Sequence, residues 1–94
     1  MEIKLEQRRS NIGSFYIDND GEWMGRMDFL TRDGIMNIYH TEISEQIQGK
    51  HLGEQLVEAG VNYARKNNLK ILPTCTFARS VFNREKAYQD VLVD

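Results

Sequence analysis

The hydrophobic pattern changes its period in the middle of the chain, and this change limits the possible folds more than any other feature. Between Ile12 and Ile43 the apolar residues form short runs, separated by turn sequences at residues 18–21 and 31–34 that both end in Asp-Gly. From Leu52 to Asn67 they recur at helical spacing. The pattern therefore predicts an antiparallel meander of strands followed by an amphipathic helix.

Further elements complete the predicted fold. The predicted strands are Ile3–Gln7 at an edge, Ile12–Ile17, Trp23–Leu30, Ile35–Ile43 and, after the helix, Leu69–Thr74. A second helix is predicted over Phe77–Glu85 and a short terminal element over Ala87–Leu92. Strand, helix and strand make a βαβ-like crossover, which pairs its two strands in parallel. At 94 residues the chain is long enough for one core, so we expect a single α+β domain spanning residues 1–94.

Composition excludes several classes of protein. A net charge of −2 argues against general nucleic-acid binding, which needs a basic surface. The chain has no apolar run near the roughly 20 residues that cross a membrane, and its first residues do not resemble a signal peptide. Cys75 is the only cysteine, so it forms neither an internal disulfide nor, by itself, a metal site. We expect a cytoplasmic protein without a bound metal, a monomer or weak dimer.

The loop between the third strand of the meander and the long helix is a candidate anion site. It consists of Gln48, Gly49, Lys50, His51, Leu52 and Gly53. The first turn of a helix leaves backbone N–H groups unpaired, and the helix dipole adds partial positive charge there. A Ser, Thr, Asp or Asn side chain usually caps these groups, and the loop places none at residues 48–51. The loop predicts a phosphate or pyrophosphate site, with an ordinary strand-to-helix turn as the alternative.

His40 and Glu42 are candidate catalytic residues on the strand before this loop. Simple alternation puts both on one face of the strand with Met36 and Ile38, and puts Thr41 on the other face. An imidazole beside a carboxylate can act as a general base near neutral pH. A polar pair at a strand end is the alternative interpretation.

Cys75 is a candidate nucleophile. It precedes the second predicted helix, and a helix N-terminus favours the reactive thiolate form of cysteine, with Arg79 one turn further on. The alternative is a buried, inert cysteine. Two residues before it, Pro73 cannot donate a ladder hydrogen bond, so it marks a sheet edge or a place where neighbouring strands part.

Together these features resemble the GNAT acyltransferase superfamily. Its signature is Arg or Gln, two residues, Gly or Ala, one residue, then Gly or Ala; Gln48 and Gly53 match the ends, while His51 stands where the family has Gly or Ala. Residues 38–42, 67–78 and 88–91 are similar to the small single-domain GNAT-like subfamily. Members of that subfamily lack the first helices of the superfamily and carry a cysteine just after the last sheet strand.

The resemblance implies an N-acetyltransferase that moves an acetyl group from acetyl-coenzyme A to a small-molecule or protein amine. The amides of residues 48–53 would hold the pyrophosphate, with Lys50 adding charge. The pantetheine arm would lie beside Ile43 and Thr74, and the thioester would end near Cys75. In one route His40 or Glu42 takes a proton from the attacking amine; in the other, Cys75 accepts the acetyl group first.

Two other functions remain open from the sequence. One is a coenzyme A-binding regulatory protein without catalysis. The other is a protein-interaction module, without nucleotide binding, that uses the sheet face around Tyr16, Trp23 and Phe29. The histidine at position 51 favours either of these over the enzyme.

Overall fold

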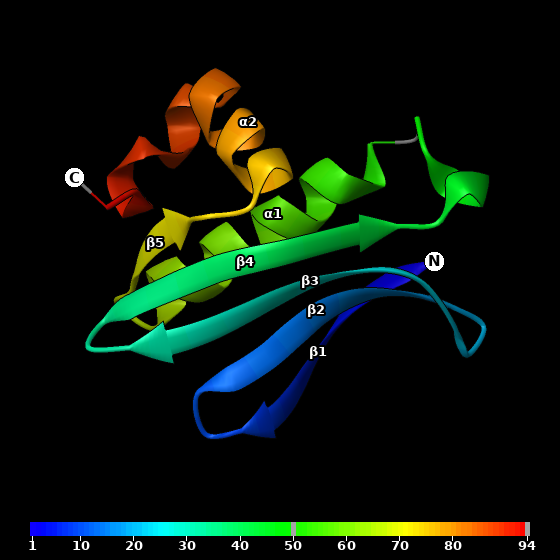
Figure 1. Ribbon diagram of the computed structural model, residues 1–94, viewed down its shortest axis with the longest axis horizontal. Helices are drawn as coiled ribbons and strands as arrows, with labels where there is room; N and C mark the ends of the chain where they lie inside the picture. The colour runs from blue at the N-terminus through cyan, green and yellow to red at the C-terminus, as the bar shows by residue number, and fades with distance from the viewer. Residues whose placement is uncertain (50, 94) are drawn as a thin grey trace.

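The computed structural model describes residues 1–49 and 51–93 and shows an α+β fold (Figure 1). Its elements in chain order are β1 (Glu2–Arg9), β2 (Ile12–Asn19), β3 (Glu22–Arg32), β4 (Ile35–Ile43), the 3₁₀ turn η1 (Glu45–Ile47), α1 (Leu52–Lys66), β5 (Lys70–Pro73), α2 (Thr76–Arg84) and the 3₁₀ segment η2 (Lys86–Val91). The predicted order, a meander, a crossover and a C-terminal helix, is confirmed.

The sheet has the order β1-β2-β3-β4-β5, antiparallel through β4 and parallel between β4 and β5. The two hairpin turns that flank β3 have positive φ at both central residues, 51° and 91° at Asp20 and Gly21, and 53° and 79° at Asp33 and Gly34. Turns of this kind match the right-handed twist of the strands they join. The Asp-Gly pairs therefore determine where the meander reverses.

The core lies between the sheet and α1, which crosses one face of the sheet, while α2 lies beside α1 at the β5 end (Figure 1). Fully buried residues of the sheet include Ile17, Met27, Phe29, Met36 and Ile38, and those of α1 are Leu56, Val57, Val61 and Ala64. No helix of the described segments 1–49 and 51–93 is both long enough and apolar enough to cross a membrane.

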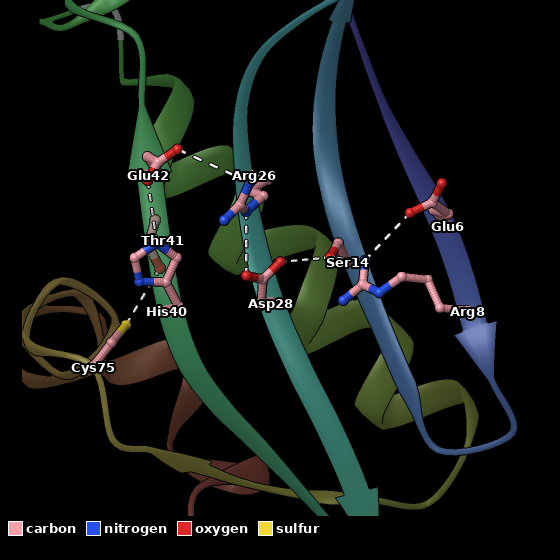
Figure 2. Close-up of polar contacts among 9 residues, drawn as sticks. All are labelled: Glu6, Arg8, Ser14, Arg26, Asp28, His40, Thr41, Glu42 and Cys75. Atoms are coloured by element: carbon pink, nitrogen blue, oxygen red, sulfur yellow. Dashed lines mark hydrogen bonds and ion pairs between the residues drawn. The ribbon is translucent and has the colours of Figure 1, made fainter.

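The opposite face of the sheet, here called the open face, carries polar and charged side chains. They include Lys4, Glu6 and Arg8 of β1, Ser14 and Tyr16 of β2, Arg26 and Asp28 of β3, and His40 and Glu42 of β4. No helix of the described residues covers it (Figures 1 and 2). The open face is therefore the solvent-accessible side of the sheet.

A β-bulge interrupts β4. Phe29 of β3 pairs with Ile38, and the preceding residue, Asp28, pairs with His40, so Tyr39 is an additional residue on β4. The side chain of Tyr39 is displaced outward, and the residue is 42% exposed. An additional residue reverses which face each later side chain takes.

The bulge makes one sequence prediction wrong. Met36 and Ile38 are fully buried on the α1 side, but His40 and Glu42 do not share that face with them. They lie on the open face, and Thr41 takes the buried side instead. Alternation along one strand cannot reveal an inserted residue, because the insertion is defined only against the partner strand.

The predicted interaction face around Tyr16, Trp23 and Phe29 also needs correction. Phe29 is fully buried in the core. Tyr16 and Trp23 stack on each other, with ring centroids 4.2 Å apart and ring planes at 18°. The exposed aromatic patch therefore consists of these two residues alone, without Phe29.

The C-terminal segment η2 is held to α1 by an ion pair. The Nε and Nη2 atoms of Arg65 donate to the two carboxylate oxygens of Asp90 at 3.0 and 2.8 Å, and Nη2 also donates to the carbonyl of Ala87 at 2.7 Å. The hydrogen bond from Arg65 lowers the pKa of Asp90 below its ordinary value of 3.8. The carboxyl of Asp90 therefore binds its proton less tightly in the folded state. Its contribution to folding stability is complete above pH 3.8 and is lost as the pH falls through the lower pKa that Asp90 has in the folded protein.

We expect Asp90→Asn to lower the midpoint of thermal unfolding near neutral pH and to have little effect in strong acid. The measurement is a pair of thermal melts, followed by circular dichroism, at each pH. Glu45→Gln, at an exposed carboxylate of η1, is the control and should follow the wild type. A difference between Asp90→Asn and wild type that stays constant down to strong acid would contradict the assignment.

Candidate functional site

The N-terminus of α1 and the end of β4 border a cavity of about 240 Å³. Its lining includes the predicted residues Ile43, Gln48, Gly49, His51, Leu52 and Gly53, together with Ile47, Glu54 and Phe77, which the sequence did not single out. Lys50, the remaining predicted loop residue, lies outside the described residues. The structure thus places most of the predicted anion loop around one hollow.

The first turn of α1 lacks a side-chain cap within the described part of the loop. His51 is the N-cap residue; it has a left-handed backbone with φ 59° and ψ 22°, and its side chain makes no cap hydrogen bond. Gly49 also has a positive φ, 84°. The N–H groups at the start of the helix are therefore left for another acceptor, and the helix dipole favours an anionic one.

Glu54 of the cavity lining contacts two basic side chains. His51 Nδ1 lies 3.0 Å from Glu54 Oε2, and Arg84 Nη2 lies 3.5 Å from the same oxygen. The hydrogen bond with His51 lowers the pKa of Glu54, and the nearby positive charge of Arg84 acts in the same direction. Glu54 thus stays ionised and holds the side chains of His51 and Arg84 close to the start of α1.

Gly53 is needed for the contact between the two helices. A Cβ atom built on Gly53 would lie 2.6 Å from Cζ of Phe77 in α2, closer than carbon atoms can approach. The glycine of the predicted motif therefore has a packing reason that the sequence alone did not show. The same ring forms part of the cavity wall.

β5 covers only the first half of β4. Their pairing ends at Ile38 and Pro73, and the N–H groups of Thr74 and Cys75 then both donate to the carbonyl oxygen of Ile38, at 2.9 and 3.2 Å. β4 continues to Ile43 without β5 beside it. Pro73 therefore lies both on an edge strand and where two strands diverge, the two alternatives that the sequence left open, and the edge of β4 is without a strand partner from residue 39 onward.

Thr74 does not line the cavity. Its hydroxyl donates to Oδ1 of Asn37 at 2.7 Å and to the carbonyl oxygen of Ile38 at 3.2 Å. Thr74 therefore lies where β5 leaves β4, away from the α1 end of the site. Its contact with the pantetheine arm stays a prediction.

Cys75 is the N-cap residue of α2 and is half-buried. Its Sγ atom accepts a hydrogen bond from the N–H of Ala78 at 3.4 Å and lies 3.3 Å from the hydroxyl of Thr41 (Figure 2). Arg79, predicted to support the thiolate, instead donates to the carbonyl of Thr74 at 3.4 Å. The thiol is thus placed against β4 just beyond the bulge, at the positive end of a helix.

His40 and Glu42 belong to a row of polar contacts on the open face (Figure 2). Nε2 of His40 lies 3.3 Å from Oε1 of Glu42, and Nη1 of Arg26 lies 4.0 Å from the other carboxylate oxygen. Nε of Arg26 donates to Asp28 at 3.2 Å, and the hydroxyl of Ser14 donates to the same aspartate at 2.5 Å. Glu42 is therefore held between an imidazole and a guanidinium that is itself anchored.

Three residues of this row, Ser14, Arg26 and Asp28, did not stand out in the sequence. Asp28 is only 8% exposed although no helix of the described residues covers its face, because the neighbouring side chains enclose it. The available signal was a serine and an aspartate between apolar residues of two adjacent strands. No group of three or more metal-binding side chains occurs among residues 1–49 and 51–93.

Comparison with protein families identifies the class of this protein. Residues 14–91 match the family described as GCN5-related N-acetyl-transferase. The chain therefore belongs to the GCN5-related N-acetyltransferase family and is an acyltransferase of that class. A comparison with curated protein sequences found no match.

Solved structures agree with this assignment. A GCN5-like protein from Staphylococcus aureus, determined by NMR, is 32% identical, with 96% of this chain and 87% of that chain aligned at a TM-score of 0.71. The ribosomal-protein-S18-alanine N-acetyltransferase from Escherichia coli is 11% identical, with 81% and 52% aligned at a TM-score of 0.69. An aminoglycoside N-acetyltransferase in complex with CoA is 14% identical, with 81% and 67% aligned at a TM-score of 0.65. The last two show likeness of fold alone, and this chain spans about half of the Escherichia coli enzyme.

We expect Gly53→Ala to destabilise the protein by about 1–3 kcal/mol, because the added methyl group forces the Phe77 ring and the start of α1 apart. Urea unfolding of the single variant measures the effect. Phe77→Leu in the same chain should relieve part of the clash, so the double variant should lose less than the sum of the two single variants. Strictly additive losses would show that the clash is absorbed elsewhere.

Proposed function

We propose that the chain transfers the acetyl group of acetyl-coenzyme A to an amine, with the coenzyme bound along β4. The observation that carries the proposal is that two features occur together at the C-terminal end of β4. The uncapped start of α1 forms a cavity beside Ile43, and β5 leaves the same part of β4 without a strand partner. Family membership supports this reading, and a relative of the same fold is described in complex with CoA.

The loop would hold the pyrophosphate of the donor. Backbone N–H groups at Gln48, Gly49 and residues 51–53 offer hydrogen bonds, and Lys50 is predicted to add charge. The pantetheine arm would extend past Ile43 and hydrogen-bond to the accessible edge of β4 as an added strand does. This course leads from the loop toward the bulge, where Cys75, Thr41 and His40 lie.

Direct transfer is the route that we adopt. The acceptor arrives as an ammonium ion and gives one proton to the His40–Glu42 pair, whose nitrogen and oxygen lie 3.3 Å apart. The neutral nitrogen attacks the thioester carbonyl carbon, a C–N bond forms, and the C–S bond breaks. The second proton of the nitrogen passes to the departing coenzyme thiolate, which leaves the amide and free coenzyme A.

A two-step route through Cys75 is the rival mechanism. Its thiolate would attack the thioester, release coenzyme A and carry the acetyl group as a thioester until the amine displaces it. The Sγ atom lies 3.3 Å from the hydroxyl of Thr41 and 3.4 Å from the N–H of Ala78. These contacts agree with a thiol that only caps α2 as well as with a nucleophilic thiol. The two routes differ in one observable, a covalent acetyl-enzyme.

We expect coenzyme A to bind wild type, Cys75→Ser and Cys75→Ala with similar affinity, and acetyl-coenzyme A to leave no adduct on any of them. Calorimetry measures the binding, and intact mass after incubation with acetyl-coenzyme A detects the adduct. An acetyl adduct on the wild type that both variants lack would establish the two-step route. Absence of coenzyme binding in all three proteins would overturn the proposed function.

We expect Glu42→Gln and His40→Asn to lower kcat/KM for an amine found by screening by about 10²–10⁴-fold, because each change disables the proton acceptor. Affinity for coenzyme A should stay within error, since neither residue lines the coenzyme cavity. Steady-state kinetics and calorimetry on the same preparations provide both values. Unchanged kcat/KM in both variants would place the base elsewhere. Coenzyme binding without turnover of any amine would favour the regulatory protein.

A further inference from the structure

We propose that a second cavity, on the open face, binds the acceptor as a primary alkylammonium ion. This proposal rests on the proposed function. The cavity has a volume of about 170 Å³ and lies between the start of β3 and the end of β4. Its lining includes Trp23, Arg26, Glu42 and Ser44, together with Met24 and Gly25.

A second β-bulge creates this hollow. Ile17 pairs with Gly25 and Asp18 pairs with Trp23, so Met24 is an additional residue on β3. The side chains of Trp23 and Arg26 on the open face are consequently three residues apart in sequence rather than two, because Met24 is buried and the Cβ position of Gly25 faces the core residue Ile17. The additional residue thus leaves a wider gap between two side chains of the open face.

The aromatic wall of the cavity is held in place. Trp23 is 43% exposed, and its ring stacks on Tyr16 of the neighbouring strand. Stacking fixes the indole before any ligand arrives, so little rotamer entropy is lost on binding. Indole is the aromatic ring with the strongest attraction for a cation over its face.

The charged wall favours a cation over an anion. Arg26 is held by the buried Asp28 at 3.2 Å and also lies 4.0 Å from Glu42. Asp28 lies outside the cavity lining and hydrogen-bonds the guanidinium of Arg26, so the Glu42 carboxylate, 4.0 Å from Arg26, is left able to pair with a ligand cation. An alkylamine with a pKa of about 10.4, like that of lysine, is protonated near neutral pH and complements this wall.

The cavity also adjoins the proposed proton acceptor. Ile43 contributes to the lining of both this cavity and the coenzyme cavity, so this cavity lies beside the pyrophosphate end of the proposed coenzyme path. Glu42 contributes to this wall and also contacts His40. An ammonium ion bound to Glu42 would thus lie next to the His40–Glu42 pair, the proposed acceptor of its proton.

The sequence provides a reporter for the test, because Trp23 is the only tryptophan. n-Pentylamine, 1-pentanol and pentanoate are titrated separately into the full chain without coenzyme, and Trp23 fluorescence is recorded. We expect saturable binding of the amine, with affinity at least about ten-fold higher than that for the alcohol or the acid. Glu42→Gln should weaken amine binding about five-fold, as expected for the loss of a partly exposed ion pair with an adjacent cation–π contact.

Matched variants separate this site from general surface charge. Glu45→Gln removes an exposed carboxylate three residues away that does not line the cavity, and it should leave the amine affinity unchanged. Trp23→Leu, followed by amide chemical shifts in NMR, should weaken amine binding as well. An equal loss in Glu45→Gln, equal affinity for alcohol or acid, or no saturable amine binding would each overturn the inference.

Coenzyme A affinity measured on the same samples distinguishes failure of this inference from failure of the proposed function. Coenzyme binding without amine binding overturns only the acceptor cavity. Amine binding without coenzyme binding supports the cavity as an ammonium site and overturns the acetyltransferase proposal. Loss of both overturns both.

Discussion

The carbonyl oxygen of Ile38 accepts hydrogen bonds from the N–H groups of both Thr74 and Cys75, and the arrangement of the site depends on this contact. It ends the pairing of β5 with β4, turns the chain into α2 and brings Cys75 against Thr41. The bulge at Tyr39 begins at the next residue of β4, so the strand loses its neighbour and reverses its faces at nearly the same point. A backbone edge and a set of polar side chains become accessible together as a result.

The two faces of the sheet carry different chemistry because of this geometry. The α1 side supplies an uncapped helix N-terminus and the apolar wall around Ile43, which suit an extended anionic donor. The open face supplies the Glu42 carboxylate, beside an Arg26 that is anchored by the buried Asp28, and this carboxylate suits a small cation. Donor and acceptor would then approach the end of β4 from opposite sides, with Glu42 lining the cavity of the open face and Ile43 lining both cavities.

Local patterns predicted the elements well. The strand Ile35–Ile43 has the predicted bounds, and α1 differs from its prediction by one residue at its end, because hydrophobic period and Asp-Gly turns act over a few residues. The position of Gly53 could be matched to a motif, but its contact with Phe77 could not. The faces of His40 and Glu42, and the role of Asp28, depend on how neighbouring strands align. The sequence of a single strand does not show how that strand aligns with its neighbour.

The sequence by itself determined the class of fold, the order of the elements and the segments of the candidate site, since each follows from interactions between residues close in the chain. The tertiary structure alone decided which of those residues meet. It joined most of the loop to Ile43 in one cavity, left Thr74 outside it, and placed Arg26 between Asp28 and Glu42. The physical reason is that two single-residue bulges, in β3 and β4, reset the direction of the side chains that follow, and a bulge exists only in relation to the strand beside it.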